Sequence, residues 1–371
     1  MTTGPTGPTE RTGTAAGALV EIEGLTKLYS LDSGWPARKR SWLSAVEDVD
    51  LAVRRGEVLG LVGESGSGKS TLARLLIRLL EPTRGEVRYE GKNIFALSRR
   101  ELRRLRRKVQ IVFQDPYSSL NPRHTVGHIV GEGIERQTVR ARAARTAELL
   151  ELVGLSPAVH DRYPHEFSGG QRQRICIARA LAVGPEFLIL DEPVSSLDVS
   201  VQSKILNLLG DLKETLELTY VLISHDLGVV RHISDRVAVM YLGHLVEVAP
   251  RRELFSAPRH PYTQALLSAV PAISANRERG RRILLTGEIP TAVDIPARCR
   301  FATRCFRVID TCWNVVPRLE AVGHAHEVAC FNHAPIAEAL ADRAATGGGQ
   351  GSAASGLPQD LPARASPLEP T

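Results

Sequence analysis

The chain has 371 residues, 43% of them apolar and 24% charged, with a formal net charge of +6. This is the composition of a folded globular protein with one large domain or two modest ones, which excludes a disordered or membrane-embedded chain. No apolar run approaches the roughly 18 residues of a membrane-spanning helix, and the N-terminus does not have the pattern of a secretory signal. We therefore expect a cytoplasmic protein that reaches any membrane through a partner.

Both ends of the sequence, residues 1–17 and 343–371, are rich in Gly, Pro, Ser, Thr and Ala without apolar periodicity, which predicts disordered tails. Between them, short apolar runs alternate with amphipathic helical stretches. This alternation predicts an α/β fold with a mainly parallel sheet covered on both faces. The expected strand and helix segments are 58–62, 70–80, 174–182, 187–190, 201–212 and 220–224.

Residues 236–249 have a different pattern, with two apolar runs separated by Gly243 and His244. Two apolar runs around a glycine-containing dipeptide predict a hairpin. We therefore expect a tight turn at Gly243 and His244 and an antiparallel portion of the sheet.

The composition also divides the chain into parts. Helical spacing at about residues 120–168 predicts a helical insertion in the sheet domain. From about residue 250 the sequence becomes rich in Pro, Arg and Cys. We assign one domain to residues 18–250 and a smaller C-terminal unit to residues 251–335.

Residues 98–109 are densely basic, a charge pattern that nucleic-acid binding would also produce. No aromatic residues interleave the arginines as base-stacking platforms would. The alternative is a solvated helix whose Arg stems lie on apolar surface. We therefore expect no nucleic-acid partner.

Residues 63–71, GESGSGKST, match the pattern G-x-x-x-x-G-K-S/T between an apolar strand and a helix. Glycines let successive backbone N–H groups point at phosphate oxygens, and the helix N-terminus adds partial positive charge. Lys69 is expected to reach the outer phosphates, Ser70 to place its hydroxyl on Mg²⁺, and Thr71 to make a further phosphate contact. A flexible Gly/Ser turn is the alternative. The expected nucleotide-binding residues are Gly63, Glu64, Ser65, Gly66, Ser67, Gly68, Lys69, Ser70 and Thr71.

Asp191 and Glu192 end an apolar strand, 187–190. Strand ends near a phosphate loop are where an acid meets Mg²⁺, so Asp191 is assigned to the metal, through water. Glu192 is then placed to orient or deprotonate the attacking water. The alternative, that the two acids merely cap the strand, does not account for the phosphate loop.

Residues 167–174, FSGGQRQR, resemble the signature sequence of ABC ATPases, with Phe167 where Leu is commonest. Ser168, Gly169, Gly170 and Gln171 open a helix, and such a helix end offers a hydroxyl, N–H groups and a dipole to an anion. One chain thus carries two phosphate-binding ends. This suggests two subunits that face each other, each completing the other's site.

Further segments resemble the same family in the expected order. Gln114 resembles the glutamine that senses Mg²⁺ and contacts the membrane subunit, and His225 resembles the histidine that holds the γ-phosphate. Tyr29 resembles the aromatic on which adenine stacks, although Trp35 and Trp42 lie nearby and compete for this role. The loop across the dimer interface is matched by Ser196, Leu197 and Asp198.

Residues 112–123, 164–174 and 260–271 resemble the oligopeptide/dipeptide branch of ABC importers, specifically its second ATPase subunit. The resemblance implies a phosphate-loop ABC ATPase that uses ATP and Mg²⁺ to drive peptide import. It also implies a second ATPase subunit, two permease subunits, an extracytoplasmic solute-binding protein and a place on the cytoplasmic face of the membrane. Importers of nickel or short sugars share similar subunits. A soluble ABC ATPase and a regulatory nucleotide-binding protein are further alternatives.

The C-terminal unit contains four cysteines, Cys299, Cys305, Cys312 and Cys330. In a cytosolic protein four thiols indicate metal rather than disulfides. Their spacing resembles the cysteine motif of this branch, which can carry a 4Fe–4S iron–sulfur cluster on four thiolates. Arg298 replaces a glycine common in that motif. Zinc, a disulfide and unligated thiols are the alternatives.

Overall fold

The computed structural model describes residues 17–31, 41–134, 138–269, 283–285, 287 and 290–334. The tails expected at residues 1–17 and 343–371 lie outside these residues apart from Gly17, as does Trp35.

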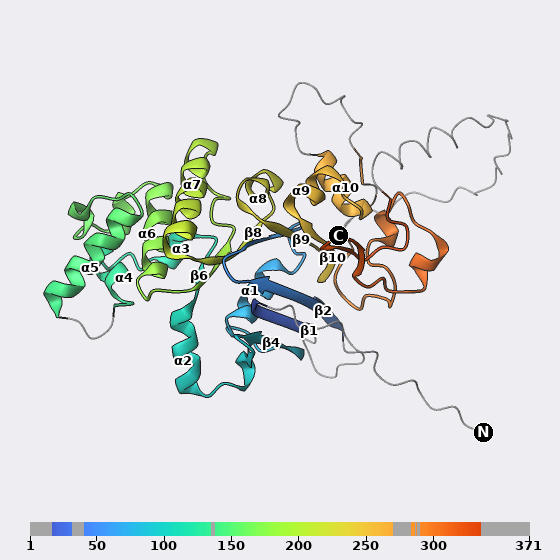
Figure 1. Cartoon of the computed structure of the whole chain (residues 1–371), viewed down its shortest axis with the longest axis horizontal. Coiled ribbons are helices and arrows are strands. Elements are labelled where there is room, and N and C mark those ends of the chain that lie inside the picture. Colours follow the sequence, from blue (N-terminus) through green and yellow to red (C-terminus); the bar gives the residue numbers. More distant parts are fainter. Residues whose placement is uncertain are drawn as a thin grey trace, which may run out of the picture.

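An eight-stranded sheet forms the centre of the molecule, in the order β11-β12-β10-β9-β3-β8-β7-β6 (Figure 1). Its strands from β9 to β6 are parallel to one another, whereas β10, β12 and β11 are antiparallel to their neighbours. The parallel strands therefore end at one edge, where chemistry-bearing loops meet. The bounds are β3 Val58–Val62, β6 Val109–Val112, β7 Phe187–Asp191, β8 Thr219–Ser224, β9 Arg236–Tyr241, β10 His244–Pro250, β11 Glu320–Gly323 and β12 His326–Val328.

A second, antiparallel sheet has the order β2-β1-β4-β5 and lies beside α1 (Figure 1). Its strands are β1 Ala18–Ser30, β2 Trp42–Arg54, β4 Arg84–Tyr89 and β5 Lys92–Asn93. The α-helices are α1 Lys69–Leu76, α2 Arg99–Lys108, α3 Pro116–Ser119, α4 Val126–Gly131, α5 Val139–Leu152, α6 Gly169–Leu181, α7 Val199–Leu216, α8 Leu227–Ile233, α9 Arg251–Ser256 and α10 Pro261–Ser268. Short 3-10 helices are η1 Ile94–Ala96, η2 Pro157–Val159, η3 Pro164–Glu166, η4 Ala302–Arg304 and η5 Asp310–Trp313.

Strands β3, β7 and β8 of the central sheet are buried along their whole length, and both faces of these strands are therefore largely apolar. In β7, Leu188 and Leu190 join the core that includes α6, α7 and α8, whereas Phe187 and Ile189 join the core that includes α1 and the second sheet. Successive strand residues point to opposite faces, so both sets must be apolar. Burial on both faces is therefore the physical reason for the apolar runs from which the α/β sheet was predicted.

The hairpin between β9 and β10 turns one residue earlier than predicted. Leu242 and Gly243 occupy the turn with φ of 43° and 85°, while His244 already pairs with Tyr241. Two successive positive φ values are the geometry that matches the twist of a two-residue hairpin. The prediction of Gly243 and His244 as the turn was therefore wrong by one residue.

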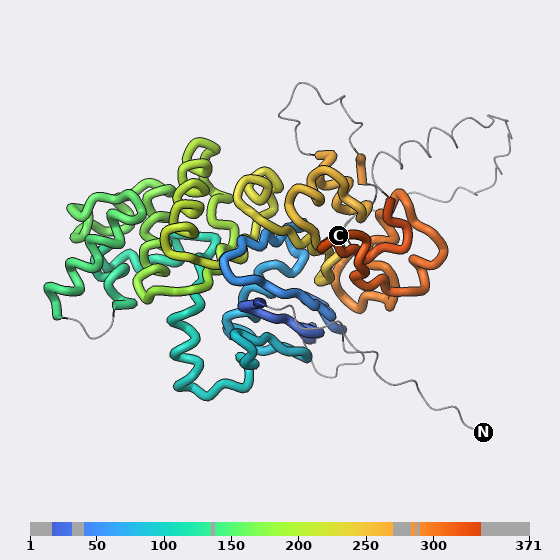
Figure 2. The backbone as a smooth tube through the Cα atoms, viewed as in Figure 1, coloured from blue at the N-terminus to red at the C-terminus, as the bar shows by residue number. Residues whose placement is uncertain are grey.

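The C-terminal residues share the core and the sheet of the preceding part. β12 pairs with β10, so residues 320–328 extend the central sheet. The ring of Phe301 lies 5.2 Å from that of Tyr241 and 5.5 Å from that of Tyr262. Figure 2 shows the C-terminal residues, coloured orange to red, at the end of the molecule opposite the green helical residues of α4 and α5. Within the described ranges no helix is long and apolar enough to cross a bilayer.

Candidate nucleotide-binding site

The loop between β3 and α1 has a conformation that only glycine adopts easily. Gly66 and Gly68 have φ of 78° and 104°. A Cβ added at Gly68 would lie 2.1 Å from the carbonyl oxygen of Ala45, and one at Gly63 would lie 2.2 Å from that of Met240. Backbone atoms cannot yield to such contacts. The loop therefore wraps tightly before α1, as phosphate binding by backbone N–H groups requires.

Replacing Gly68 with Ala is expected to destabilise the fold by about 1–3 kcal/mol and to weaken MgATP binding at least about tenfold. Thermal unfolding and calorimetric titration measure the two effects. Gly210→Ala in α7 is the control, because its Cβ would meet nothing within 4 Å. Alanine at this partly exposed helix position should stabilise the fold by up to about 1 kcal/mol. Tight MgATP binding by Gly68→Ala would contradict the expected role of this glycine.

Lys69 lies inside this loop and is only 4% exposed. Its Nζ donates to the carbonyl oxygens of Gly63 and Glu64, each at 2.8 Å, and to Ser67 Oγ at 3.3 Å. Burial lowers the pKa of Lys69, and the carboxylates of Glu192, Asp191 and Glu64 oppose this shift. The carbonyls thus fix the ammonium where the loop would surround an anion.

Ser70 and Asp191 meet across the gap between α1 and the end of β7. Ser70 Oγ donates to Asp191 Oδ1 at 3.1 Å. Burial raises the pKa of Asp191, and the hydrogen bond from Ser70 opposes this shift. A hydroxyl and a carboxylate are oxygen donors of the kind Mg²⁺ takes together with substrate phosphates and water. The residues present therefore fit a magnesium ion.

Glu192 directly follows β7, and its side chain contacts residues that follow two other strands, β6 and β8. Its Oε2 accepts from Gln114 Nε2 at 3.0 Å and lies 3.1 Å from His225 Nδ1. Gln114 follows β6, and His225 follows β8. Glu192 has a φ of 48°, and its N–H donates to the carbonyl of Ile223 at 3.0 Å. A non-glycine residue held at positive φ is strained, and such strain clusters at functional sites.

A cavity of about 490 Å³ adjoins this group and is lined by Ser70, Gln114 and Asp191. Arg74 and Arg179 also line it, and neither was predicted from the sequence. The charge of Arg74 favours the ionised form of Asp191 and so acts against the rise in its pKa. Arg74 could have been found from its position four residues after Ser70, because helix residues at that spacing lie on one face.

Comparison with known proteins decides the family. The family described as ABC transporter matches residues 46–195, and the one described as oligopeptide/dipeptide transporter, C-terminal region, matches residues 246–312. The probable peptide ABC transporter ATP-binding protein y4tS of Sinorhizobium fredii is 51% identical over 87% of this chain and 92% of its own. The chain belongs to the ABC transporter ATPases.

Two further similarities support this membership. The oligopeptide transport ATP-binding protein AppF of Bacillus subtilis is 48% identical over 84% of this chain and 96% of its own. The post-hydrolysis dimer of the ATP-binding cassette MJ0796, bound to ADP and phosphate, has a TM-score of 0.55 at 31% identity and covers 63% of this chain and 99% of its own. The predicted α/β phosphate-loop ABC fold is confirmed, and this ABC ATPase is an ATP-hydrolysing protein.

The predicted signature residues, Ser168, Gly169, Gly170 and Gln171, lie at the start of α6, with Ser168 as its N-cap. Ser168 accepts from the N–H of Gln171 at 3.4 Å, while Gln171 Oε1 accepts from the N–H of Ser168 at 3.0 Å. A Cβ at Gly169 would lie 3.2 Å from Leu197, and one at Gly170 would lie 2.4 Å from Val201. These residues therefore pack on Leu197 of the loop 196–198 and on Val201 of α7 in the same chain, whereas α1 lies elsewhere in Figure 1.

Two other predicted residues lie on the second sheet. Tyr29 pairs with Leu43, and the ammonium of Lys27 lies 5.1 Å from the centre of its ring. Trp42 begins β2 and is 40% exposed. Neighbouring residues of β2 reach the phosphate loop, because Ala45 contacts the position of Gly68. A role for Tyr29 in adenine stacking stays a prediction.

The predicted iron–sulfur ligands do not form a metal site in the described part of the chain. Cys305 interacts electrostatically with the three other cysteines of this group, and Cys330 interacts with Cys299 and Cys312, so the four thiols lie in one region. However, no group of three or more His, Cys, Asp or Glu side chains among the described residues could hold a metal ion. Burial raises the pKa of Cys305 to about 12 and that of Cys330 to about 11. The arrangement of the described residues does not fit the cluster.

Proposed function

We propose that this ABC ATPase drives peptide import from the cytoplasmic face of a membrane. The convergence of Gln114, Glu192 and His225 beside Lys69 and Asp191 carries the catalytic part of this proposal. The relatives are named as peptide transport proteins, and residues 246–312 match the oligopeptide/dipeptide transporter family; both observations support the peptide part.

The first step is nucleotide binding. The N–H groups of residues 66–71 and the ammonium of Lys69 hold the β- and γ-phosphates. Ser70 and Asp191 would hold Mg²⁺, which would supply neutralisation of the phosphate charge. The adenine stacks on Tyr29. The cavity beside Ser70 and Asp191 leaves room for groups to approach the γ-phosphate.

The second step is hydrolysis at an interface between two ATPase subunits. The partner subunit presents its own signature helix end to the γ-phosphate, as Ser168, Gly169, Gly170 and Gln171 do for the partner's nucleotide. Glu192 accepts a proton from the attacking water. Gln114 and His225 orient the carboxylate, because both contact the same oxygen, Oε2.

In the third step, the movement that follows hydrolysis is transmitted to the permease subunits. Loss of the γ-phosphate removes the charge that joins the two subunits, so they separate. Gln114 connects the site with α3, α4 and α5, and these elements are the proposed docking region for two permease subunits. A solute-binding protein on the other side of the membrane delivers the substrate.

Reconstitution in lipid vesicles tests this proposal. The chain is assembled with a partner ATPase, two permease subunits and a solute-binding protein from the same cell, and ATP hydrolysis and solute uptake are measured together. We expect short peptides to stimulate both. Stimulation by nickel or short sugars, with none by peptides, would assign the importer to another solute. ATP hydrolysis without any coupled uptake would contradict a transport function.

A further inference from the structure

The C-terminal residues contact the phosphate loop directly, at Glu64. Arg304 Nη1 donates to Glu64 Oε2 at 2.9 Å, and Nη2 donates to Oε1 at 3.3 Å, across 240 residues of sequence. The side chain of Arg304 is 8% exposed, and that of Glu64 is 24% exposed. Two parallel contacts between a guanidinium and a carboxylate fix both position and orientation.

The backbone of Glu64 is held by the same region. Its N–H donates to the hydroxyl of Tyr262 in α10 at 2.9 Å. Tyr262 is fully buried, and its ring lies 4.7 Å from that of Tyr241 at the end of β9. Arg304 also donates to the Tyr241 hydroxyl at 3.4 Å. The carbonyl of Glu64 accepts from Lys69, so Arg304 and Lys69 are connected through one residue.

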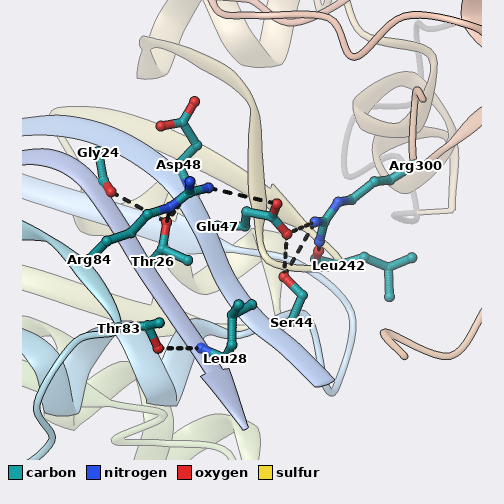
Figure 3. A network of polar contacts seen from close by, with 10 residues as sticks. All are labelled: Gly24, Thr26, Leu28, Ser44, Glu47, Asp48, Thr83, Arg84, Leu242 and Arg300. Atoms are coloured by element: carbon teal, nitrogen blue, oxygen red, sulfur yellow. Dashed lines mark hydrogen bonds and ion pairs between the residues drawn. The ribbon is translucent and has the colours of Figure 1, made fainter. Parts of the chain in front are cut away.

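A second arginine of the same C-terminal segment, Arg300, also supports the phosphate loop, through a different set of contacts. Figure 3 shows Arg300 reaching Glu47 and Ser44 of β2 and the carbonyl of Leu242. Leu242 is in the β9–β10 turn, where the N–H of Gly243 donates to the carbonyl of Ser67 at 2.8 Å. The segment between Arg300 and Arg304 therefore contacts the loop itself at Glu64 and the turn that holds it at Ser67.

We propose that Arg304 is a positioning residue for nucleotide binding, which fixes Glu64 and through it the loop that carries Lys69. Arg300 supports the same loop through the β9–β10 turn. The inference rests on the proposed role of residues 63–71 in binding ATP. It gives the C-terminal residues a function in the nucleotide site that does not depend on a metal bound by their four cysteines.

The test measures MgATP affinity of the full chain by calorimetry. Arg304→Met keeps the length of the side chain and removes its charge and fork, and we expect the Kd to rise about tenfold. Arg304→Lys should recover part of this loss, because an ammonium keeps the charge but cannot make both parallel bonds. Tyr262→Phe should raise the Kd about threefold, since it removes only the acceptor for the Glu64 N–H.

Arg307→Met is the matched control. Arg307 follows Arg304 by three residues but donates to Ala334 and Asn332 within the C-terminal residues. Its replacement should leave the Kd within about twofold of wild type. Unfolding midpoints of all variants, measured without nucleotide, separate loss of folding from loss of binding.

A double-mutant cycle with Glu64→Gln decides whether the two residues act together. If they do, Glu64→Gln weakens binding when Arg304 is present and has little effect in the Arg304→Met background. Additive losses, equal losses for Arg307→Met and Arg304→Met, or an unchanged Kd in folded Arg304→Met would each overturn the inference. A wild-type chain that binds no MgATP would instead overturn the proposed function and this inference with it.

Discussion

Replacing Glu192 with Gln is expected to slow ATP hydrolysis by the assembled transporter about 10²- to 10⁴-fold, the contribution of a positioned general base. Glutamine has the same shape and still accepts a hydrogen bond from Gln114, but it cannot take a proton from water. MgATP binding should therefore stay within about twofold of wild type, so that the turnover number falls while the affinity is kept. Single-turnover hydrolysis and calorimetric titration measure the two quantities.

The matched control is Glu186→Gln. Glu186 immediately precedes β7, at the opposite end from Glu192, where its carboxylate pairs with Arg55 and Lys108 at the surface. Exposed pairs of this kind contribute at most about 1 kcal/mol, so hydrolysis by Glu186→Gln should be close to that of wild type. Undiminished hydrolysis by Glu192→Gln would reject the role assigned to this carboxylate.

Replacing Lys69 with Ala is expected to raise the Kd for MgATP about 100-fold or more, because a buried ammonium that pairs with phosphate is lost. The carbonyls of Gly63 and Glu64 would also lose their common donor. The loop would then keep its glycines without the charge at its centre. Titration with MgATP measures the change, and the unfolding midpoint checks that the variant is folded.

Lys213→Ala provides the comparison for this variant. Lys213 is in the last turn of α7 and pairs with Asp235, away from the phosphate loop. Its removal should leave the Kd unchanged within about twofold. Equal affinities of Lys69→Ala and wild type would contradict the assignment of residues 63–71 as the nucleotide site.

The α/β fold and the nucleotide motifs could be predicted from the sequence because their signals are local. Apolar strands of the central sheet are recognisable since both faces are buried, as in β7. The phosphate loop is a continuous run of nine residues, 63–71, whose glycines are needed for backbone reasons alone. Contiguous residues need no knowledge of the fold to be placed together.

Other features depended on which distant segments the fold brings together. Gln114, Glu192 and His225 follow three different strands, and only the parallel order of β6, β7 and β8 makes them neighbours. The left-handed backbone of Glu192 had no sequence signal. The four cysteines had a suggestive spacing, yet spacing does not fix the directions of the thiols, and the described residues form no metal site.

The contact between Arg304 and Glu64 is the clearest case of what the tertiary structure alone decided. The two residues are 240 positions apart, and no local sequence pattern links them. Their meeting requires β12 to join β10 and Phe301 to pack against Tyr241 and Tyr262. The sequence by itself determined the chemistry available to this protein, since backbone and motif preferences act over a few residues. Packing of the C-terminal residues onto the central sheet determined which side chains support that chemistry, because long-range contacts arise only when the whole core forms.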